Sequence, residues 1–164
     1  LDSKQKEFSR LVKENQGLII KVSRLYTNSL EDEQDLFQEI VLQLWRSYDS
    51  FKGQSKISTW MYRVALNTAI TLFRKKTKSP QTDELMDFHH KDFLEDDDEK
   101  QLQISLLYKV IKMLPKVERA IVMMYLDDLP YRDIAENLGI TEVNARVKMN
   151  RLKKTLKELM IQHA

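Results

Sequence analysis

Apolar side chains recur at three- and four-residue intervals over most of the chain, which is the period of helices with one buried face. In the first half, this pattern predicts helices over residues 3–27, 30–48 and 56–76, the first of them broken or bent at Gly17. In the second half, it predicts helices over residues 99–114, 116–126, 131–138 and 142–160. Ser29 and Thr141 each precede a helix and have side chains that cap helix N-termini.

The composition supports an all-α fold and excludes several classes of protein. The 164 residues include only three glycines and three prolines, too few for glycine-rich phosphate loops. No cysteine is present, which excludes disulfides, thiolate metal sites and a cysteine nucleophile. No apolar run approaches the roughly 20 residues of a membrane span, and the N-terminus is polar and charged. We therefore expect a cytoplasmic protein without membrane insertion.

Charge divides the chain into three parts. Residues 1–80 carry 14 basic and 9 acidic side chains, residues 81–100 carry 2 and 9, and residues 101–164 carry 11 and 7. Few apolar positions recur across the acidic part, so residues 79–98 are interpreted as a linker. The sequence thus predicts two small helical domains, 1–78 and 99–164, joined by an acidic linker. Two basic blocks also favour a polyanionic partner.

Residues 131–152 have the pattern of a helix-turn-helix, with small Ala135 at the helix crossing and Gly139 in the turn. We expect five apolar side chains to pack its two helices together: Ile134, Leu138, Ile140, Val143 and Val147. The last helix then exposes polar and basic side chains, and Arg and Asn are the types that read base edges. These side chains are Asn144, Arg146, Lys148, Asn150, Arg151, Lys153 and Lys154.

Two long motifs resemble those of a known family. Residues 35–46, DLFQEIVLQLWR, and 51–68, FKGQSKISTWMYRVALNT, resemble region 2 of bacterial extracytoplasmic-function sigma factors. The helix-turn-helix, with Leu114 and Pro115 ahead of it, resembles region 4 of the same class. The resemblance implies a transcription initiation factor that binds core RNA polymerase and promoter DNA. It implies no enzymatic activity, no cofactor and no metal.

The resemblance also implies three sets of site residues. The set for docking on core polymerase is Asp35, Gln38, Glu39, Leu42 and Trp45. The set for the −10 element, which such factors open, is Lys52, Ser55, Lys56, Thr59, Trp60, Arg63, Asn67, Arg74 and Lys75. Within it, Asn67 is the favoured base contact, whereas core packing is favoured over stacking for Trp60. The set for the −35 element is Thr141, Asn144, Arg146, Val147, Lys148, Asn150, Arg151 and Lys154.

In the same family the linker threads a channel for nascent RNA, whose charge the acids of residues 83–98 would imitate; a solubilising tether is the alternative. The resemblance further implies an anti-sigma factor as partner, which could hold the protein at the membrane. Val147 stands where the family usually has a small hydroxyl residue, so the −35 sequence is not predicted.

Two other functions remain open at this point. A stand-alone helix-turn-helix regulator with a helical partner-binding domain would share the C-terminal motif without needing the pattern of residues 35–68. A metal-dependent enzyme would use His89, His90 and Asp92, but these lie in the linker, and the sequence pairs no general base with a nucleophile.

Overall fold

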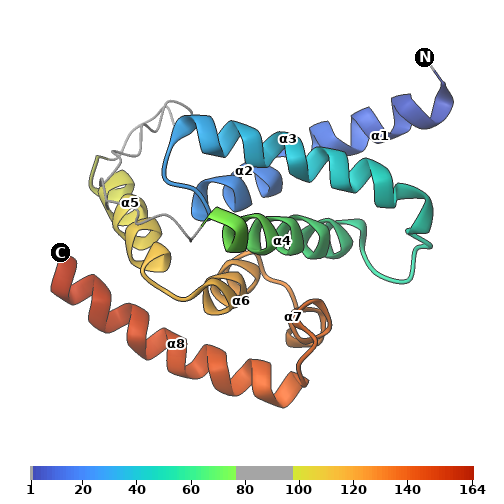
Figure 1. Cartoon of the computed structure of the whole chain (residues 1–164). Helices are drawn as coiled ribbons and strands as arrows, with labels where there is room; N and C mark the ends of the chain where they lie inside the picture. Colours follow the sequence, from blue (N-terminus) through green and yellow to red (C-terminus); the bar gives the residue numbers. More distant parts are fainter. Residues whose placement is uncertain (1, 77–97) are drawn as a thin grey trace. The chain divides into compact units, whose positions relative to one another are not determined.

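The computed structural model describes residues 2–76 and 98–164, without the side chains of residues 73–76 (Figure 1). The chain divides into two compact units, unit 1 at Leu1–Asp83 and unit 2 at Glu84–Ala164, and each is described by itself. The described residues form α-helices and one short 3-10 helix, without a strand, which confirms the all-α prediction. No helix among them combines the length and the apolar character that a membrane span requires.

Unit 1 consists of α1 (Ser3–Glu14), α2 (Gln16–Leu25), α3 (Leu30–Ser47), the 3-10 helix η1 (Tyr48–Ser50) and α4 (Ile57–Lys76). Helices α2, α3 and α4 pack against one another, and α1 packs on α2. Their apolar faces meet in a core from which water is excluded. The most buried members of this core are Ile19, Val22, Tyr26, Ile40, Leu44, Met61 and Ala65.

The single helix expected over residues 3–27 is two helices, and the break falls at Asn15 rather than at Gly17. Asn15 leaves helical geometry with φ −112° and ψ 19°, and its Nδ2 donates to the Leu11 carbonyl at 2.9 Å. An Asn side chain that bonds nearby backbone competes with the helix. Gly17 lies in the first turn of α2, so the expectation of a glycine break was wrong.

The predicted cap of α3 is confirmed. The Asp32 amide donates to Ser29 Oγ at 3.0 Å, and Glu31, Asp32 and Glu33 place negative charge in the first turn. Negative charges there stabilise the helix, because the N-terminus is the positive end of the helix dipole. Arg24 of α2 contacts Glu33 at 2.9 Å, which ties the start of α3 to the preceding helix.

Unit 2 consists of α5 (Asp98–Lys112), α6 (Lys116–Leu126), α7 (Tyr131–Leu138) and α8 (Glu142–His163). The long helix α8 packs on α5, α6 and α7, so it organises the unit (Figure 1). The core side chains of unit 2 are among the most buried of the described residues: Val110, Ile121, Val122, Met124, Ile134, Ala145 and Met149.

The turn between α7 and α8 follows the helix-turn-helix prediction. Gly139 ends α7 in left-handed geometry with φ 67° and ψ 33°, which glycine adopts without a steric cost. The Ile140 amide donates to the Ala135 carbonyl at 3.0 Å, and the Asn144 amide donates to Thr141 Oγ1 at 3.1 Å. Gly139 therefore fixes where α7 ends, and Thr141 fixes where α8 begins.

The expected packing role of Val143 and Val147 was wrong. Their side chains are 66% and 42% exposed, although Ile134 of the same predicted set is fully buried. The buried face of α8 is instead formed by residues spaced four, three and four apart, which share one side of a helix. These residues are Ala145, Met149, Leu152 and Leu156, and the two valines lie about half a turn away from them.

The left-handed turn can be tested with two alanine substitutions of opposite expected sign. Gly139→Ala should lower the free energy of unfolding of unit 2 by about 1–2 kcal/mol, because a Cβ disfavours this backbone. Gly17→Ala should raise that of unit 1 by roughly 0.4–1 kcal/mol, because alanine reduces the freedom of the unfolded chain. No atom lies within 4 Å of the position that a Cβ added to Gly17 would take.

Urea titrations provide the measurement. Circular dichroism follows the helices of both units, whereas tryptophan fluorescence follows unit 1 alone, because Trp45 and Trp60 are the two tryptophans. An unchanged or increased stability of Gly139→Ala would contradict a left-handed turn at this residue.

Candidate functional site

The outward face of α3 carries the residues predicted to dock on polymerase. Asp35 and Gln38 are exposed, and Leu42 is 40% exposed. Glu39 is half-buried and accepts a hydrogen bond from Gln43 Nε2 at 2.9 Å. The buried side of the helix is formed by Leu36, Ile40 and Leu44. An acid, an amide and a leucine therefore share a surface that the core of unit 1 does not use.

Trp45, the fifth predicted docking residue, is half-buried beneath α1. The Phe8 ring meets it edge-on with centroids 5.0 Å apart, and Lys4 Nζ lies 4.7 Å from the Trp45 ring centroid. The same ammonium group pairs with Asp49 at 2.8 Å. Sequence reasoning missed Lys4 and Phe8; the apolar position of Phe8 in the first helix was the available signal. Only part of the Trp45 surface is therefore open to a partner.

One face of α4 and the loop before it present several of the predicted −10 residues. Lys52, Lys56 and Asn67 are exposed, and Ser55 and Arg63 are half-buried. Arg63 and Asn67 are four residues apart, so they lie on the same side of α4. The loop turns at Gly53, whose φ is 72°. The structure thus places a cation beside an amide on α4 and further cations in and after the preceding loop.

Two predicted −10 residues lie inside unit 1 instead. Thr59 is 2% exposed and Trp60 is 9% exposed. The loop folds Phe51 onto Trp60, with ring centroids 5.1 Å apart, so the indole packs as core, as the sequence favoured. Neither side chain offers a surface to DNA in this conformation. Arg74 and Lys75 belong to the last turn of α4, and their side chains lie outside the described part of the structure.

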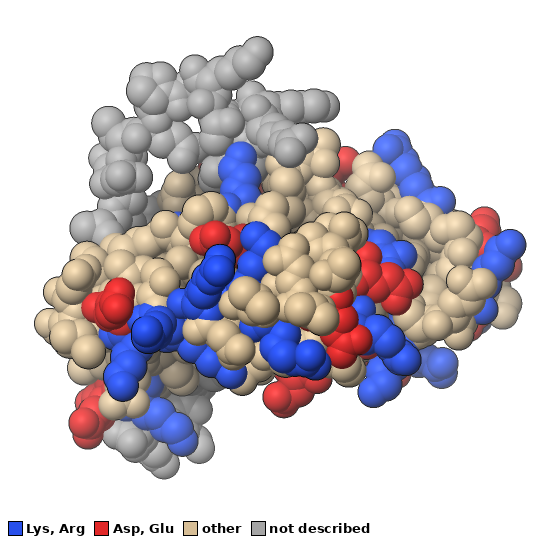
Figure 2. Space-filling view, turned by 90° about the horizontal axis from the view of Figure 1, so that it is seen from below, with Lys and Arg blue, Asp and Glu red and all other residues tan. Residues whose placement is uncertain are grey.

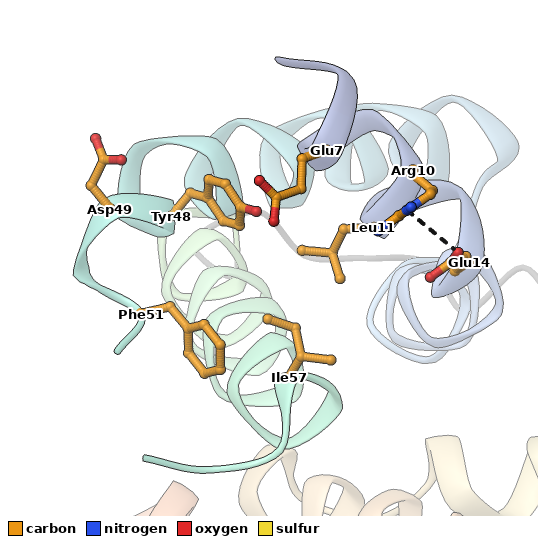
Figure 3. Close-up of a pocket in the computed structure, with 8 residues that line it drawn as sticks. All are labelled: Glu7, Arg10, Leu11, Glu14, Tyr48, Asp49, Phe51 and Ile57. Carbon is orange, nitrogen blue, oxygen red and sulfur yellow. Dashed lines mark ion pairs between the residues drawn. The ribbon is translucent and has the colours of Figure 1, made fainter. Parts of the chain in front are cut away.

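A cavity of about 420 Å³ opens between α1 and the start of this loop (Figure 3). Leu11, Phe51 and Ile57 give it apolar walls, and the Tyr48 hydroxyl points toward the Glu7 carboxylate. Burial and the neighbouring Glu7 raise the pKa of the Tyr48 phenol. The other residues that line the cavity are charged: Arg10, Glu14 and Asp49. Lys52, Ser55 and Lys56, predicted to line a pocket for an unstacked base, do not line this cavity.

Helix α8 presents the predicted −35 residues on the side away from the core of unit 2. Thr141 caps the helix and is itself exposed. Lys148 is half-buried, whereas the remaining members are exposed: Asn144, Arg146, Val147, Asn150, Arg151 and Lys154. Blue side chains gather in the left and centre of Figure 2, along α8. This surface can meet a polyanion and offers amides beside its cations.

Two cations of α8 are held by aromatic rings. The Arg146 guanidinium lies 5.1 Å from the Tyr131 ring centroid and 3.3 Å from Glu142 Oε1. Lys153 Nζ lies 4.7 Å from the Tyr125 ring centroid, and a hydrogen bond to Tyr125 raises the pKa of Lys153. Tyr125 and Tyr131, which the sequence analysis did not place in the site, therefore orient part of the basic surface.

A metal site has no support among residues 2–76 and 98–164, where no group of three or more His, Cys, Asp or Glu side chains is placed to hold an ion. The candidate residues His89, His90 and Asp92 lie outside the described residues.

Comparison with known families matches both units. Sigma-70 region 2 matches residues 11–79, and Sigma-70, region 4 matches residues 104–156. The ECF RNA polymerase sigma factor SigG of Mycobacterium tuberculosis is 41% identical over 54 residues, which are 33% of this chain. The match spans only 15% of the length of SigG.

A relative that aligns over a longer stretch and a solved structure agree with these matches. The sigma factor RpoE of Bartonella quintana, solved with the anti-sigma factor NepR, has the same fold, with a TM-score of 0.74 at 18% identity over 94% of this chain and 97% of that one. The ECF RNA polymerase sigma-E factor of Haemophilus influenzae is 30% identical over 144 residues, which cover 80% of this chain and 76% of that protein. The chain belongs to the extracytoplasmic-function family of RNA polymerase sigma factors.

Proposed function

We propose that this protein is a transcription initiation factor, which binds core RNA polymerase and directs it to promoters with a −10 and a −35 element. The observation that carries the proposal is the match to both sigma regions in order along one chain. The protein performs no covalent chemistry in this role. Its contribution is the free energy of binding to polymerase and DNA, which selects the site and favours the opened strand.

Core polymerase docks on the outward face of α3. Asp35 and Gln38 supply hydrogen-bond acceptors and a donor, and Leu42 supplies apolar area at the centre of the surface. This combination suits a partner surface with basic and apolar side chains, because charges set orientation and rate while the apolar centre excludes water. Trp45 contributes the part of its side chain that α1 leaves exposed.

The −10 element is held and opened along α4. An opened strand exposes base edges and retains its phosphates, so it needs cations beside hydrogen-bonding side chains. Arg63 provides positive charge beside the exposed Asn67 amide, which can donate to and accept from a base edge, and Lys56 adds positive charge at the start of the helix. Lys52 and Ser55 extend this surface into the loop, and Arg74 and Lys75 would meet phosphates beyond it.

The −35 element is read as duplex by α8 in the major groove. Asn144 and Asn150 can pair with base edges, and Lys148, Arg151 and Lys154 can meet phosphates. Tyr131 and Glu142 hold the Arg146 guanidinium at the start of the helix, where it can meet either a base edge or a phosphate. Thr141 positions the helix through its cap.

In this proposal, residues 1–78 form the domain that binds polymerase and the −10 element, and residues 99–164 form the domain that binds the −35 element. Residues 79–98 form the acidic linker between them. Most of the linker lies outside the described residues, and its imitation of RNA charge stays a prediction. An anti-sigma factor is the proposed regulatory partner, supported by the fold of a sigma factor solved with NepR. The protein then works in the cytoplasm, and such a partner could hold it at the membrane.

A stand-alone regulator is disfavoured, because it would need only the helix-turn-helix. Such a regulator has no use for a region 2 domain, which is the family matched by residues 11–79.

The docking face is tested by reversing one charge. Asp35→Arg should weaken binding to core polymerase by more than tenfold, because like charges brought together at an interface cost several kcal/mol. Glu14→Arg makes the same change in charge at an exposed acid of α1 and should leave binding within about twofold, because Glu14 is not part of the docking face. Titration of labelled protein with core polymerase measures both; equal losses would refute the docking face.

The role of Asn67 is tested by separating binding from promoter opening. Asn67→Ala should leave polymerase binding unchanged and reduce open-complex formation roughly tenfold, as expected for about 1–3 kcal/mol from one base contact. Permanganate reactivity of unpaired thymines reports opening. Gln16→Ala removes an exposed amide from α2 and serves as control. A parallel loss of polymerase binding and opening would contradict a role in base contact.

A further inference from the structure

The first two turns of α8 carry two exposed valines among polar side chains. Val143 is 66% exposed and Val147 is 42% exposed, and they stand one turn apart on the same side of the helix. The core of unit 2 uses the opposite side, through Ala145 and Met149, which are 0% and 1% exposed. The centre of the outward face is therefore apolar.

The surroundings of the two valines indicate what they meet. Exposed Asn144, Asn150 and Arg151 flank them, and Lys154 continues the same face. An apolar protein surface would have to strip water from these groups without replacing their hydrogen bonds. A nucleic acid offers phosphates and base edges to the polar groups, and it also has one apolar group in the major groove, the C5-methyl of thymine.

Arg146 is directed away from this apolar centre. Its guanidinium is drawn to Glu142 at 3.3 Å and to the Tyr131 ring at 5.1 Å, toward α7. The residues that remain at the centre of the outward face are thus Val143 and Val147, with an asparagine beside each. The chemistry of that centre suits a base pair with a methyl group better than a guanine, which offers only acceptors to a protein in the major groove.

We propose that Val143 and Val147 read thymine C5-methyl groups in the −35 element, as specificity-determining residues of this sigma factor. The inference rests on the proposed function, in which α8 enters the major groove. It assigns Val143 a role in DNA contact in place of the core role that its spacing had predicted.

The test exchanges thymine for uracil, which removes the methyl group and leaves the base edges unchanged. Holoenzyme formed from the full chain and core polymerase first selects promoters from a pool randomised over the −35 region. Each selected thymine in that region is then replaced by deoxyuridine. Removal of a contacted methyl should weaken promoter binding about fourfold for the unaltered chain, the factor expected for one buried methyl group.

The protein variant is Val143→Ala with Val147→Ala, and both sites are exposed, so the fold should tolerate the change. This variant should bind thymine and deoxyuridine promoters equally. Ile161→Ala, at another exposed apolar residue of α8, should retain the fourfold difference. The same pattern in transcription from these promoters would support the proposal.

Three outcomes would overturn the proposal. One is a selected −35 element without thymine, another is a wild-type holoenzyme indifferent to deoxyuridine, and the third is a valine variant that keeps the full difference. Each of these leaves the sigma function intact if the holoenzyme still initiates at the selected promoters. A holoenzyme that neither selects nor transcribes any promoter would overturn the proposed function and this inference with it.

Discussion

The burial of one face of α8 is the constraint on which the proposed DNA-reading surface depends. Ala145, Met149 and Leu152 lie in the core of unit 2, and rotating the helix by a single residue position would bring polar or charged side chains into that core. Burying a polar group without a partner costs roughly 2–7 kcal/mol and burying a charge costs more, whereas a contact with a base is worth about 1–3 kcal/mol. Core packing therefore fixes which side chains of α8 face outward. The same division holds on α3, where Ile40 and Leu44 are buried and Asp35 and Leu42 are exposed.

Aromatic packing, more than charge, positions α1 on unit 1. Phe8 is 8% exposed and meets the rings of Trp45 and Tyr48 at 5.0 and 5.4 Å. Burying such a side chain is worth about 1.5–3 kcal/mol, and each ring pair adds roughly 0.5–1.5 kcal/mol. The exposed Lys4–Asp49 pair, at 2.8 Å, is worth at most about 1 kcal/mol. Helix α1 thus decides how much of Trp45 a partner can reach.

Local signals in the sequence predicted the helices well, because their causes are local. Ser29, Thr141 and Gly139 each act on backbone within a few residues, and the structure confirms all three. The two valines of α8 were misplaced because a valine at helical spacing is apolar whether it faces the core or a partner. Only the position of the helix against its neighbours distinguishes the two, and that position follows from contacts distant in sequence.

The candidate site shows the same limit. The family resemblance placed Thr59 and Trp60 among the −10 residues, but both are buried in unit 1, and Phe51 of the preceding loop packs on Trp60. The hold of Tyr131 on Arg146 also depends on the angle between α7 and α8, which no local pattern encodes. The family resemblance thus indicated the candidate surfaces, whereas tertiary packing decides which of their members are exposed.

Transcription from fragmented genomic DNA tests the central claim most directly. Purified core polymerase from the same organism is incubated with and without this protein, and the 5′ ends of the transcripts are mapped. The account predicts discrete new starts that appear only with the protein and share two short elements upstream, one near −10 and one near −35. An active core that gains no new start from the folded protein would contradict it, and binding of the protein alone to duplex DNA would then favour a stand-alone regulator.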